Sequence, residues 1–549
     1  MTSTVASYLI ERLRQNDADV LFGIPGTSCA AVFAAADDAG MTTVVNSSEL
    51  DAGYAADGFA RMRGLGVVSV SYGVGTLSLA NAVAGAFVER SAVVVVNGGP
   101  GARDLWNERH YGLLYSHSTG RPFTDLAVFK QITAFAARIE RAAEAPDLID
   151  EAIERALREQ RPVYIEVPHD LWAAPCSKPA RALDSSRPPS GREAELAEEI
   201  ARLIGQARRP AILLGVEIAR YGLAEAAEVL VTTSGLPWAT TLLAKSVLAE
   251  TTPGFVGVYD SDLAPKPVAR LLEESDCILS LGSVFGIDHG KLVTTRHDEM
   301  LVIADGWFRI GSQVPVRAEL GPLIENLAAN LRRDEAAALS ETPAGFESRR
   351  RWADEPTETE LTHEQLYRSV DRFLDEEWIV VHDTCLGSYP SADLSVAGRN
   401  AFICCPVWLS IGHSIGAAVG VGMADRRRPL VICGDGGFQI TAAGLSAMAR
   451  HKLRAVVIVI DNGLYAIEQY LIEPQWYEDP KLDPLPYVGL NRWDYPALAK
   501  SMGFAYAATV TTDSELEFAL ADAREWDGPG LISVRMAPRD LPPENRAGL

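Results

Sequence analysis

The chain has 549 residues and a formal net charge of −23, with 48% hydrophobic and 22% charged residues. This length suggests about three domains of a globular protein. Because a polyanion would be repelled over most of so acidic a surface, we expect neither nucleic acid nor an anionic membrane as a partner.

The first residues and the cysteines indicate a cytoplasmic protein. The start of the chain, MTSTVASYLIERLRQ, predicts an amphipathic helix and lacks the basic start and apolar core of a signal peptide. The longest apolar runs, such as 92–96 and 455–460, fall far short of the ~20 residues that span a bilayer. Seven cysteines form no C-x-x-C pair, and Cys404-Cys405 lie in an apolar stretch, so we expect reduced, structural thiols.

Two polar stretches divide the chain into blocks of similar size. Residues 177–192 are rich in proline, serine and charge, and residues 332–360 are charged with few apolar side chains. Both stretches are typical of linkers. They predict three domains, which are 1–176, 193–332 and 361–549.

Short Val- and Ile-rich runs alternate with longer helical patterns, such as 50–63 and 77–90, in every block. The runs predict strands, in chain order, at 67–70, 93–96, 163–167, 211–215, 277–282, 379–381, 430–433, 456–460 and 531–534. Continuous apolar strands separated by helices predict an α/β fold with three doubly wound parallel-sheet domains. The first and third blocks both end in a Gly/Pro turn and a strand, so we expect these two domains to be related.

The sequence GDGG at 434–437 directly follows the apolar run 430–433. Ligands of open α/β sheets bind beyond the carboxyl ends of the strands, and the N-terminus of a helix, expected here from Phe438, suits an anion. An acid at such a place makes sense if a divalent cation lies between it and a phosphate, because Mg²⁺ prefers hard oxygen ligands. Asp435 is therefore a predicted Mg²⁺ ligand.

A second oxygen ligand is expected at the end of the next strand. The run 455–460 ends in Asp461-Asn462-Gly463-Leu464. Adjacent parallel strands end side by side, so Asn462 can reach the ion of Asp435, and the Leu464 carbonyl can add a third ligand. Either motif alone would be read as a tight turn, but the two together, each after a strand, favour a metal–diphosphate site.

These two motifs resemble the thiamine diphosphate (ThDP) motif. The whole chain resembles a ThDP-dependent 2-oxo acid decarboxylase of the pyruvate, indolepyruvate and phenylpyruvate decarboxylase type. Further matching segments follow in the same order, namely FGIPG at 22–26, SELDAGYAADGFAR at 48–61, YGVG at 72–75, KSVL at 245–248, GVY at 257–259 and WLSIG at 408–412. The resemblance implies pyrimidine-binding, middle and diphosphate-binding domains, with ThDP and Mg²⁺ as cofactors.

The resemblance also implies cofactor contacts. Glu49 matches the carboxylate that hydrogen-bonds the pyrimidine ring, and Ile411 matches the bulky residue that keeps the cofactor bent. The Leu409 carbonyl would accept a hydrogen bond from the cofactor amine. The remaining residues expected to contact the cofactor are Thr384, Gly434, Gly436 and Gly437 at the diphosphate, and Ile467 beside the metal turn.

Proton handling after the loss of CO₂ is assigned by the resemblance to His117 and Glu468. Proteins of this type commonly carry a second histidine before the first and an aspartate after the Gly-Ile-Pro-Gly turn. Ser116 and Thr27 stand at these two positions.

The leading interpretation is non-oxidative decarboxylation of a 2-oxo acid to an aldehyde. The alternative is carboligation with an aldehyde or ketone acceptor, which gives 2-hydroxy ketones or 2-hydroxy-3-oxo acids.

Two other classes are less well supported. A flavin or nicotinamide oxidoreductase would need G-x-G-x-x-G after a strand, and Leu213-Leu214-Gly215-Val216-Glu217 lacks it. A non-catalytic protein that kept the fold is opposed by the joint presence of the predicted metal and pyrimidine ligands.

The resemblance implies a homodimer or a homotetramer, since one cofactor is shared between two subunits. The sequence leaves the identity of the 2-oxo acid open.

Overall fold

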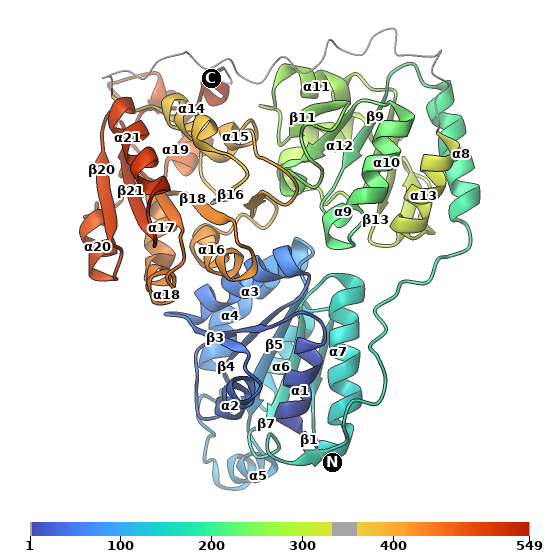
Figure 1. Ribbon diagram of the computed structural model, residues 1–549, viewed down its shortest axis with the longest axis vertical. Coiled ribbons are helices and arrows are strands. Elements are labelled where there is room, and N and C mark those ends of the chain that lie inside the picture. The colour runs from blue at the N-terminus through green and yellow to red at the C-terminus, as the bar shows by residue number, and fades with distance from the viewer. Residues whose placement is uncertain (1–2, 332–359, 548–549) are drawn as a thin grey trace.

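The chain folds into three α/β bodies, each built on its own sheet (Figure 1). The structure, a computed structural model, describes residues 3–331 and 360–547. The linker predicted at 177–192 contains neither helix nor strand, and it runs along the outside of the molecule from the first body to the second. The linker predicted at 332–360 lies outside the described residues except for Glu360.

The first body has a six-stranded parallel sheet with the order β3-β2-β4-β5-β7-β6. Its strands are β2 (Val20–Gly23), β3 (Thr42–Val45), β4 (Gly66–Ser71), β5 (Val93–Gly99), β6 (Phe135–Arg138) and β7 (Val163–Pro168), and a short pair is β1 (Ser3–Thr4) with β8 (Pro175–Cys176). Its helices are α1 (Val5–Arg14), α2 (Ala30–Asp38), α3 (Glu49–Arg63), α4 (Val74–Val88), α5 (Ala102–Tyr111), α6 (Thr124–Ile132) and α7 (Ala145–Glu159).

The third body has a six-stranded parallel sheet with the order β17-β16-β18-β19-β21-β20. Its strands are β16 (Trp378–His382), β17 (Phe402–Cys404), β18 (Arg428–Gly434), β19 (Val456–Asp461), β20 (Tyr506–Val510) and β21 (Gly530–Arg535). Its helices are α14 (His363–Phe373), α15 (Ser388–Ser391), α16 (His413–Ala424), α17 (Asp435–Thr441), α18 (Leu445–Arg450), α19 (Ala466–Ile472), α20 (Tyr495–Ser501), α21 (Asp513–Arg524) and α22 (Pro543–Ala547).

The first and third sheets share one topology. Numbered within each body, both place their strands in the order second, first, third, fourth, sixth, fifth. By this correspondence β4 matches β18, β5 matches β19, and helix α3 matches α16 because each precedes the third strand of its sheet. The expected relation between the first and third domains is therefore confirmed.

The middle body departs from the predicted parallel sheet at one edge. Its strands, in sheet order, are β11 (Phe255–Tyr259), β10 (Trp238–Thr241), β9 (Pro210–Leu214), β12 (Cys277–Leu281), β13 (Met300–Ala304), β14 (Trp307–Ile310) and β15 (Val316–Arg317). The last two are antiparallel, because Asp305 (φ 54°) and Gly306 (φ 75°) form a two-residue hairpin turn of the kind that Asp-Gly favours. Its helices are α8 (Glu193–Gln206), α9 (Glu217–Arg220), α10 (Ala224–Ser234), α11 (Lys266–Glu273), α12 (Gly290–Thr295) and α13 (Leu320–Asn330).

Helices α3 and α16 pack against each other and join the first body to the third (Figure 1). Glycines allow this close approach. A Cβ added to Gly420 would lie 2.0 Å from the Ala55 carbonyl oxygen, and one added to Gly58 would lie 2.3 Å from the carbonyl oxygen of Ala417. Val, Ile and Phe side chains from both sheets form one continuous hydrophobic core on either side of this contact.

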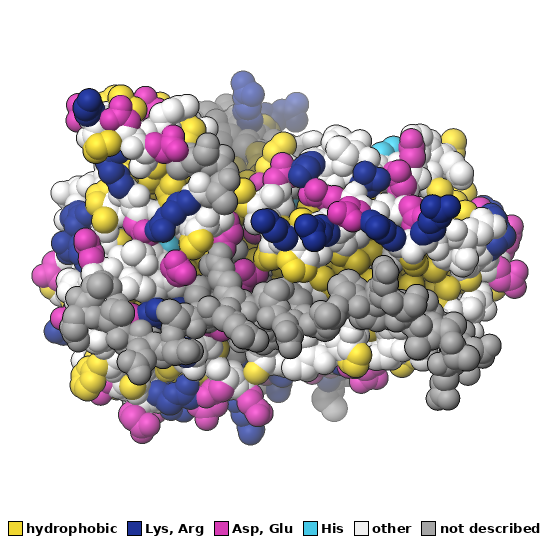
Figure 2. Space-filling model, turned by 90° about the horizontal axis from the view of Figure 1, so that it is seen from above, with side chains coloured by type: hydrophobic (Ala, Val, Ile, Leu, Met, Phe, Trp, Pro, Cys, Tyr) yellow, Lys and Arg dark blue, Asp and Glu magenta, His cyan; other side chains and the backbone are white. Residues whose placement is uncertain are grey.

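The surface mixes charges of both signs. Figure 2 shows the face over the second and third bodies, where basic and acidic side chains are interspersed and hydrophobic side chains lie between them. No helix within 3–331 or 360–547 combines the length and the apolar character needed to cross a bilayer.

We predict that Gly420→Ala destabilises the protein although alanine is the better helix former. The added methyl group must displace the Ala55 carbonyl, and overpacking of this kind costs about 1–3 kcal/mol. Thermal unfolding monitored by circular dichroism should show a lower Tm.

The matched control is Gly205→Ala in α8, where an added Cβ meets no atom within 4 Å. There the Tm should stay level or rise, because alanine in place of glycine stabilises a helix by about 0.5–1 kcal/mol. Equal changes in Tm for both variants would contradict the close contact between α3 and α16.

Candidate functional site

The carboxylate of Asp435 ties together the turns that follow β18 and β19. Gly434 ends β18, and α17 begins at Asp435, three residues before the predicted helix start at Phe438. Asp435 is only 2% exposed. Its Oδ1 accepts the N–H of Gly436 at 2.9 Å, and its Oδ2 accepts the N–H of Gly463 at 2.6 Å. The two predicted motifs therefore meet at one buried side chain.

The environment of Asp435 favours a bound cation. Burial raises the pKa of this carboxyl to about 7; the N–H of Gly463 opposes this shift, and the nearby charge of Asp461 adds to it. A buried carboxylate whose ionised form is this costly is stabilised by a positive ion beside it. The chemistry of the residue thus fits a divalent cation at this edge of the sheet.

The other two predicted metal ligands lie in the same turn. Asn462 is buried, and its Oδ1 accepts the N–H of Leu464 at 3.1 Å. The Leu464 carbonyl accepts the N–H of Ala466 at 2.9 Å. Each of these oxygens has a second lone pair for a metal ion. One carboxylate, one amide and one carbonyl suit Mg²⁺, which takes its remaining ligands from phosphate and water.

The glycines of the turn make a cradle that side chains would fill. A Cβ on Gly436 would lie 2.3 Å from the Tyr465 ring, and one on Gly437 would lie 3.0 Å from Oδ1 of Asp383. Both residues belong to the first turn of α17, whose N–H groups have no acceptor within the helix. Thr384 follows β16 at the same edge, where its hydroxyl donates to the Cys405 carbonyl at 3.2 Å.

Asp383 is a buried carboxylate that the sequence interpretation missed. It directly follows β16 and accepts hydrogen bonds from the N–H of Gly412 (2.9 Å), the N–H of Ser414 (3.1 Å) and the Ser414 hydroxyl (2.6 Å). Burial raises its pKa. Gly412 has a φ of 85° and is held from the other side by the Thr441 hydroxyl. The available signal was an acid at a strand end, in Val381-His382-Asp383-Thr384.

The loop that carries Leu409 and Ile411 rests on the first body. The Trp408 indole N–H donates to Oδ1 of Asn81 on α4 at 2.8 Å. The Glu89 carboxylate accepts the N–H groups of Val407 and Trp408 at 2.9 and 3.0 Å. Leu409 is exposed with a φ of 59°, and Ile411 is half-buried. Contacts within the chain therefore fix this loop between two bodies.

Glu49 and His117 border the turn that follows β4, which is the counterpart of the GDGG turn after β18. A Cβ on Gly75 would lie 3.5 Å from Oε1 of Glu49. A Cβ on Gly73 would lie 2.2 Å from the His117 carbonyl oxygen. Glu49 begins α3 and is half-buried, whereas His117 lies exposed on a loop with a φ of 66°. The structure thus brings these two residues to the same edge of the first sheet.

The predicted residues form two separate groups within one chain. Among the described residues, no hydrogen bond or ion pair joins Glu49 or His117 to Asp435. Glu468 is exposed in the first turn of α19, and the half-buried Ile467 packs in a small cluster with Leu464. One chain therefore carries the predicted residues in two groups, at corresponding edges of related sheets.

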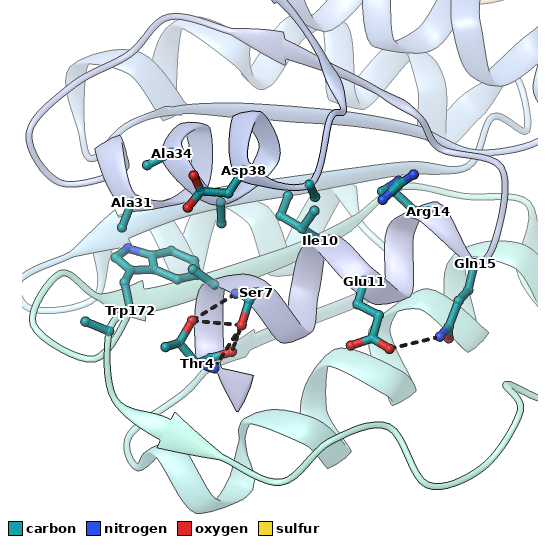
Figure 3. Close-up of a pocket in the computed structure, with 14 residues that line it drawn as sticks. Thr4, Ser7, Ile10, Glu11, Arg14, Gln15, Ala31, Ala34, Asp38 and Trp172 are labelled. Atoms are coloured by element: carbon teal, nitrogen blue, oxygen red, sulfur yellow. Dashed lines mark hydrogen bonds between the residues drawn. The ribbon is translucent and has the colours of Figure 1, made fainter. Parts of the chain in front are cut away.

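A surface groove of about 730 Å³ lies elsewhere, between α1, α2 and Trp172 (Figure 3). Alanines form much of its wall, and the hydrogen bonds drawn there join groove residues to one another, such as Ser7 to Thr4 and Gln15 to Glu11. None of the predicted site residues lines it. Its size alone does not make it the functional site.

Family models for thiamine pyrophosphate enzymes match three parts of the chain; thiamine pyrophosphate is another name for ThDP. The N-terminal TPP binding domain matches residues 3–114, the central domain 197–306 and the C-terminal TPP binding domain 386–534. The first match includes Glu49 and ends before His117. The last match includes Asp435, Asn462 and Glu468.

Similar proteins cover almost the whole chain. It is 30% identical to an alpha-keto-acid decarboxylase of Mycobacterium avium over 551 residues, which span 98% of this chain and 95% of that protein. It is 29% identical to an alpha-keto-acid decarboxylase of Mycobacterium leprae over 552 residues, with 98% and 94% covered. It is 30% identical to pyruvate decarboxylase 1 of Zea mays over 538 residues, with 94% and 85% covered. With three matching domain models and a cradle at the expected strand ends, the chain belongs to the ThDP-dependent 2-oxo acid decarboxylase family.

Proposed function

We propose that the protein removes CO₂ from a 2-oxo acid and releases the aldehyde that is one carbon shorter, with ThDP and Mg²⁺ as cofactors. The observation that carries this proposal is the Asp435 carboxylate, which is buried and joins the turns after two neighbouring strands. The relatives named as decarboxylases of alpha-keto acids and of pyruvate support the reaction class.

The third body would bind the diphosphate end. Asp435, Asn462 and the Leu464 carbonyl would hold Mg²⁺, while N–H groups in the first turn of α17 would bind phosphate oxygens. The Thr384 hydroxyl lies at the same edge and would turn from the Cys405 carbonyl to the diphosphate. When bound, the cofactor supplies the electron sink for the charge that the departing CO₂ leaves behind.

The pyrimidine end of the cofactor would meet residues that hydrogen bonds within the third body hold in place. Asp383 holds Gly412 and Ser414 by several hydrogen bonds, and this anchors Ile411, the residue expected to keep the cofactor bent. The Leu409 carbonyl would accept from the cofactor amine. The left-handed backbone of Leu409 supports this role, because the strain indicates a conformation imposed by the surrounding structure.

We infer that two chains share each cofactor, as a homodimer or as a homotetramer built from two such dimers. Glu49 has no described contact with Asp435 in its own chain, which leaves each chain with two incomplete half-sites. Exposed apolar side chains border both of them, namely Val74 and Leu77 on α4, Leu409 on the loop and Ile440 on α17. A second copy would cover these side chains and place Glu49 opposite the partner's diphosphate site.

Proton transfers around the reacting centre would involve Glu468 and His117, as the resemblance implies. Carboxyl and imidazole groups are among the side chains that act as general acids and bases in enzymes. All seven cysteines are free thiols, and this supports a reducing compartment such as the cytoplasm.

Carboligation is a second candidate outcome of the same chemistry. Thr27 and Ser116 line one cavity beside His117, where the resemblance leads one to expect an acid and a second imidazole. Hydroxyl groups are poor proton donors near neutrality. A slower protonation would give an aldehyde or ketone acceptor time to react instead, with a 2-hydroxy ketone as the product.

The proposal is tested with purified protein, ThDP, Mg²⁺ and a panel of aliphatic and aromatic 2-oxo acids. We expect CO₂ release with at least one acid and a product whose mass is that of the shortened aldehyde. Added aldehyde acceptors would reveal carboligation as 2-hydroxy ketones. If no acid in the panel releases CO₂, the proposed reaction is contradicted.

We predict that Asp435→Asn weakens the binding of Mg²⁺ and ThDP together. The amide keeps the size of the side chain but loses the charge that a cation needs. Loss of outer partners alone costs metal sites about 10–100-fold in affinity, so loss of a ligand should cost at least about 100-fold. Calorimetry measures the binding, and EDTA should have the same effect on the wild type.

The control for this variant is Asp527→Asn, whose side chain is fully exposed and distant in sequence from the turn. It should bind both cofactors as the wild type does. Unchanged ThDP binding in Asp435→Asn, and also in EDTA, would remove Asp435 from the metal site.

We predict that two inactive variants restore activity when they are mixed. Glu49→Gln damages the pyrimidine half-site, and Asp435→Asn damages the diphosphate half-site. After dissociation and reassembly, a mixed dimer contains one cofactor site with both halves intact, so CO₂ release should return. Subunit exchange is verified by mass spectrometry of differently tagged chains, and no recovery despite proven exchange would argue against shared sites.

A further inference from the structure

A cavity of about 430 Å³ opens at the carboxyl edge of the first sheet. Its walls come from three strand ends: the turn after β2, helix α5 after β5, and the residue after β7. Its polar lining includes Thr27, Asp104, Asn107, Tyr115, Ser116 and His169. Ser116 is followed directly by His117, which packs on the turn after β4. The cavity therefore adjoins the half-site that carries Glu49 and His117.

His169 and Asp104 form a pair in this cavity. His169 Nε2 lies 2.8 Å from Oδ2 of Asp104. A carboxylate can only accept a hydrogen bond, so Nε2 carries the proton and Nδ1 is the ring nitrogen left for other partners. The His169 side chain is 40% exposed and that of Asp104 28% exposed, so both are accessible from the cavity.

The pair is held in place from several sides. The Tyr115 ring stacks on the His169 ring, with centroids 5.7 Å apart and an interplanar angle of 13°. The backbone N–H of His169 donates to the Gly99 carbonyl at the end of β5. Asp104 sits in the first turn of α5, where its Oδ2 also accepts the N–H of Gly101 at 2.9 Å. The ring orientation is therefore set by the fold before any substrate arrives.

The other polar groups of the cavity are poor proton donors. Thr27 and Ser116 offer hydroxyls, and Asn107 offers an amide, none of which ionises near neutrality. Burial raises the pKa of Tyr115 to about 12, with the charges of Asp104 and Asp170 adding to the shift, so this phenol keeps its proton. An imidazole held in one orientation by a carboxylate is a common general acid or base in enzymes.

We propose that the cavity receives the reacting end of the substrate and that His169, oriented by Asp104, supplies the proton that completes the reaction. This inference rests on the proposed decarboxylation. CO₂ departs and leaves its bonding electron pair on the 2-oxo acid carbon. That pair forms a new C–H bond with a proton that His169 carries on Nδ1 in its doubly protonated form, and the N–H electrons return to the ring, which becomes neutral. Water then reprotonates Nδ1, while Nε2–H stays bonded to Asp104.

The first test separates CO₂ release from aldehyde release in His169→Ala. A rapid-mixing experiment should still show a stoichiometric first burst of CO₂, because bond cleavage precedes the proton transfer. Steady-state aldehyde formation should fall by at least about 10-fold, since a general acid contributes about 10²–10⁴ in rate and other donors remain. Free imidazole should restore aldehyde formation by filling the space beside the Tyr115 ring.

Two further variants sharpen this test. The control is His110→Ala, on the exposed part of α5, which removes an imidazole whose Nδ1 contacts only its own helix. This variant should form aldehyde at the wild-type rate, and added imidazole should not change that rate. Asp104→Asn keeps an oxygen acceptor for the Gly101 N–H but loses the charge. It should therefore lower the rate of aldehyde formation, as His169→Ala does, while KM stays unchanged. Calorimetry should show wild-type ThDP affinity in every variant.

A second readout does not depend on turnover. Diethyl pyrocarbonate should modify His169 in the cofactor-free protein, and mass spectrometry should show protection when ThDP and an unreactive 2-oxo acid analogue are bound. Modification of His110 should stay the same. Unprotected His169, undiminished aldehyde formation in His169→Ala, or a loss of burst and aldehyde together without imidazole rescue would each overturn the assignment. A wild type that releases no CO₂ would instead contradict the proposed function itself.

Discussion

The buried carboxylate of Asp435 is the interaction on which the arrangement of the third body depends. It accepts one N–H from its own turn and one from the turn after the neighbouring strand, so the ends of β18 and β19 cannot move independently. The cost of keeping this charge away from water appears as a raised pKa. A cation bound where the turns converge, as proposed above, would offset this cost.

A second buried carboxylate, Asp383, repeats this logic one strand away. It holds the start of α16 and the loop before it, and that loop is in turn fixed by Asn81 and Glu89 of the first body. Two acids at adjacent strand ends thus fix the turns that would bind the two ends of the cofactor in the proposed site. The related first sheet carries Glu49 and His117 at the corresponding edge, and in the proposed arrangement it would supply the other half of that site.

The sequence predicted the long apolar strands well because their signal is local. Runs such as 430–433 and 456–460 are buried on both faces, and every strand predicted in this way is present with ends shifted by no more than three residues. The antiparallel edge of the middle sheet was not predicted, although Asp305-Gly306 is a strong hairpin signal, because the strands on either side are short. Helix α17 begins at Asp435 rather than Phe438, and the Asp435 carboxylate accepts the N–H of Gly436 in its first turn.

The meeting of the two turns that carry Asp435 and Asn462 could be predicted, because the spacing and the order of the strand ends suffice to bring them together. The contacts of Asp383 and His169 could not be predicted, because each is made with a partner far away in the chain: Gly412 for the first and Asp104 for the second. Hydrogen bonds across such separations leave no periodic trace in the sequence. They become visible only when the sheet order is known.

The glycine contacts between α3 and α16 also limit how the protein can move. With Gly420 against the Ala55 carbonyl and Gly58 against the carbonyl of Ala417, the two helices fit in a single register, and sliding by one residue would drive side chains into backbone. The first and third bodies of one chain are therefore expected to move together as one rigid body.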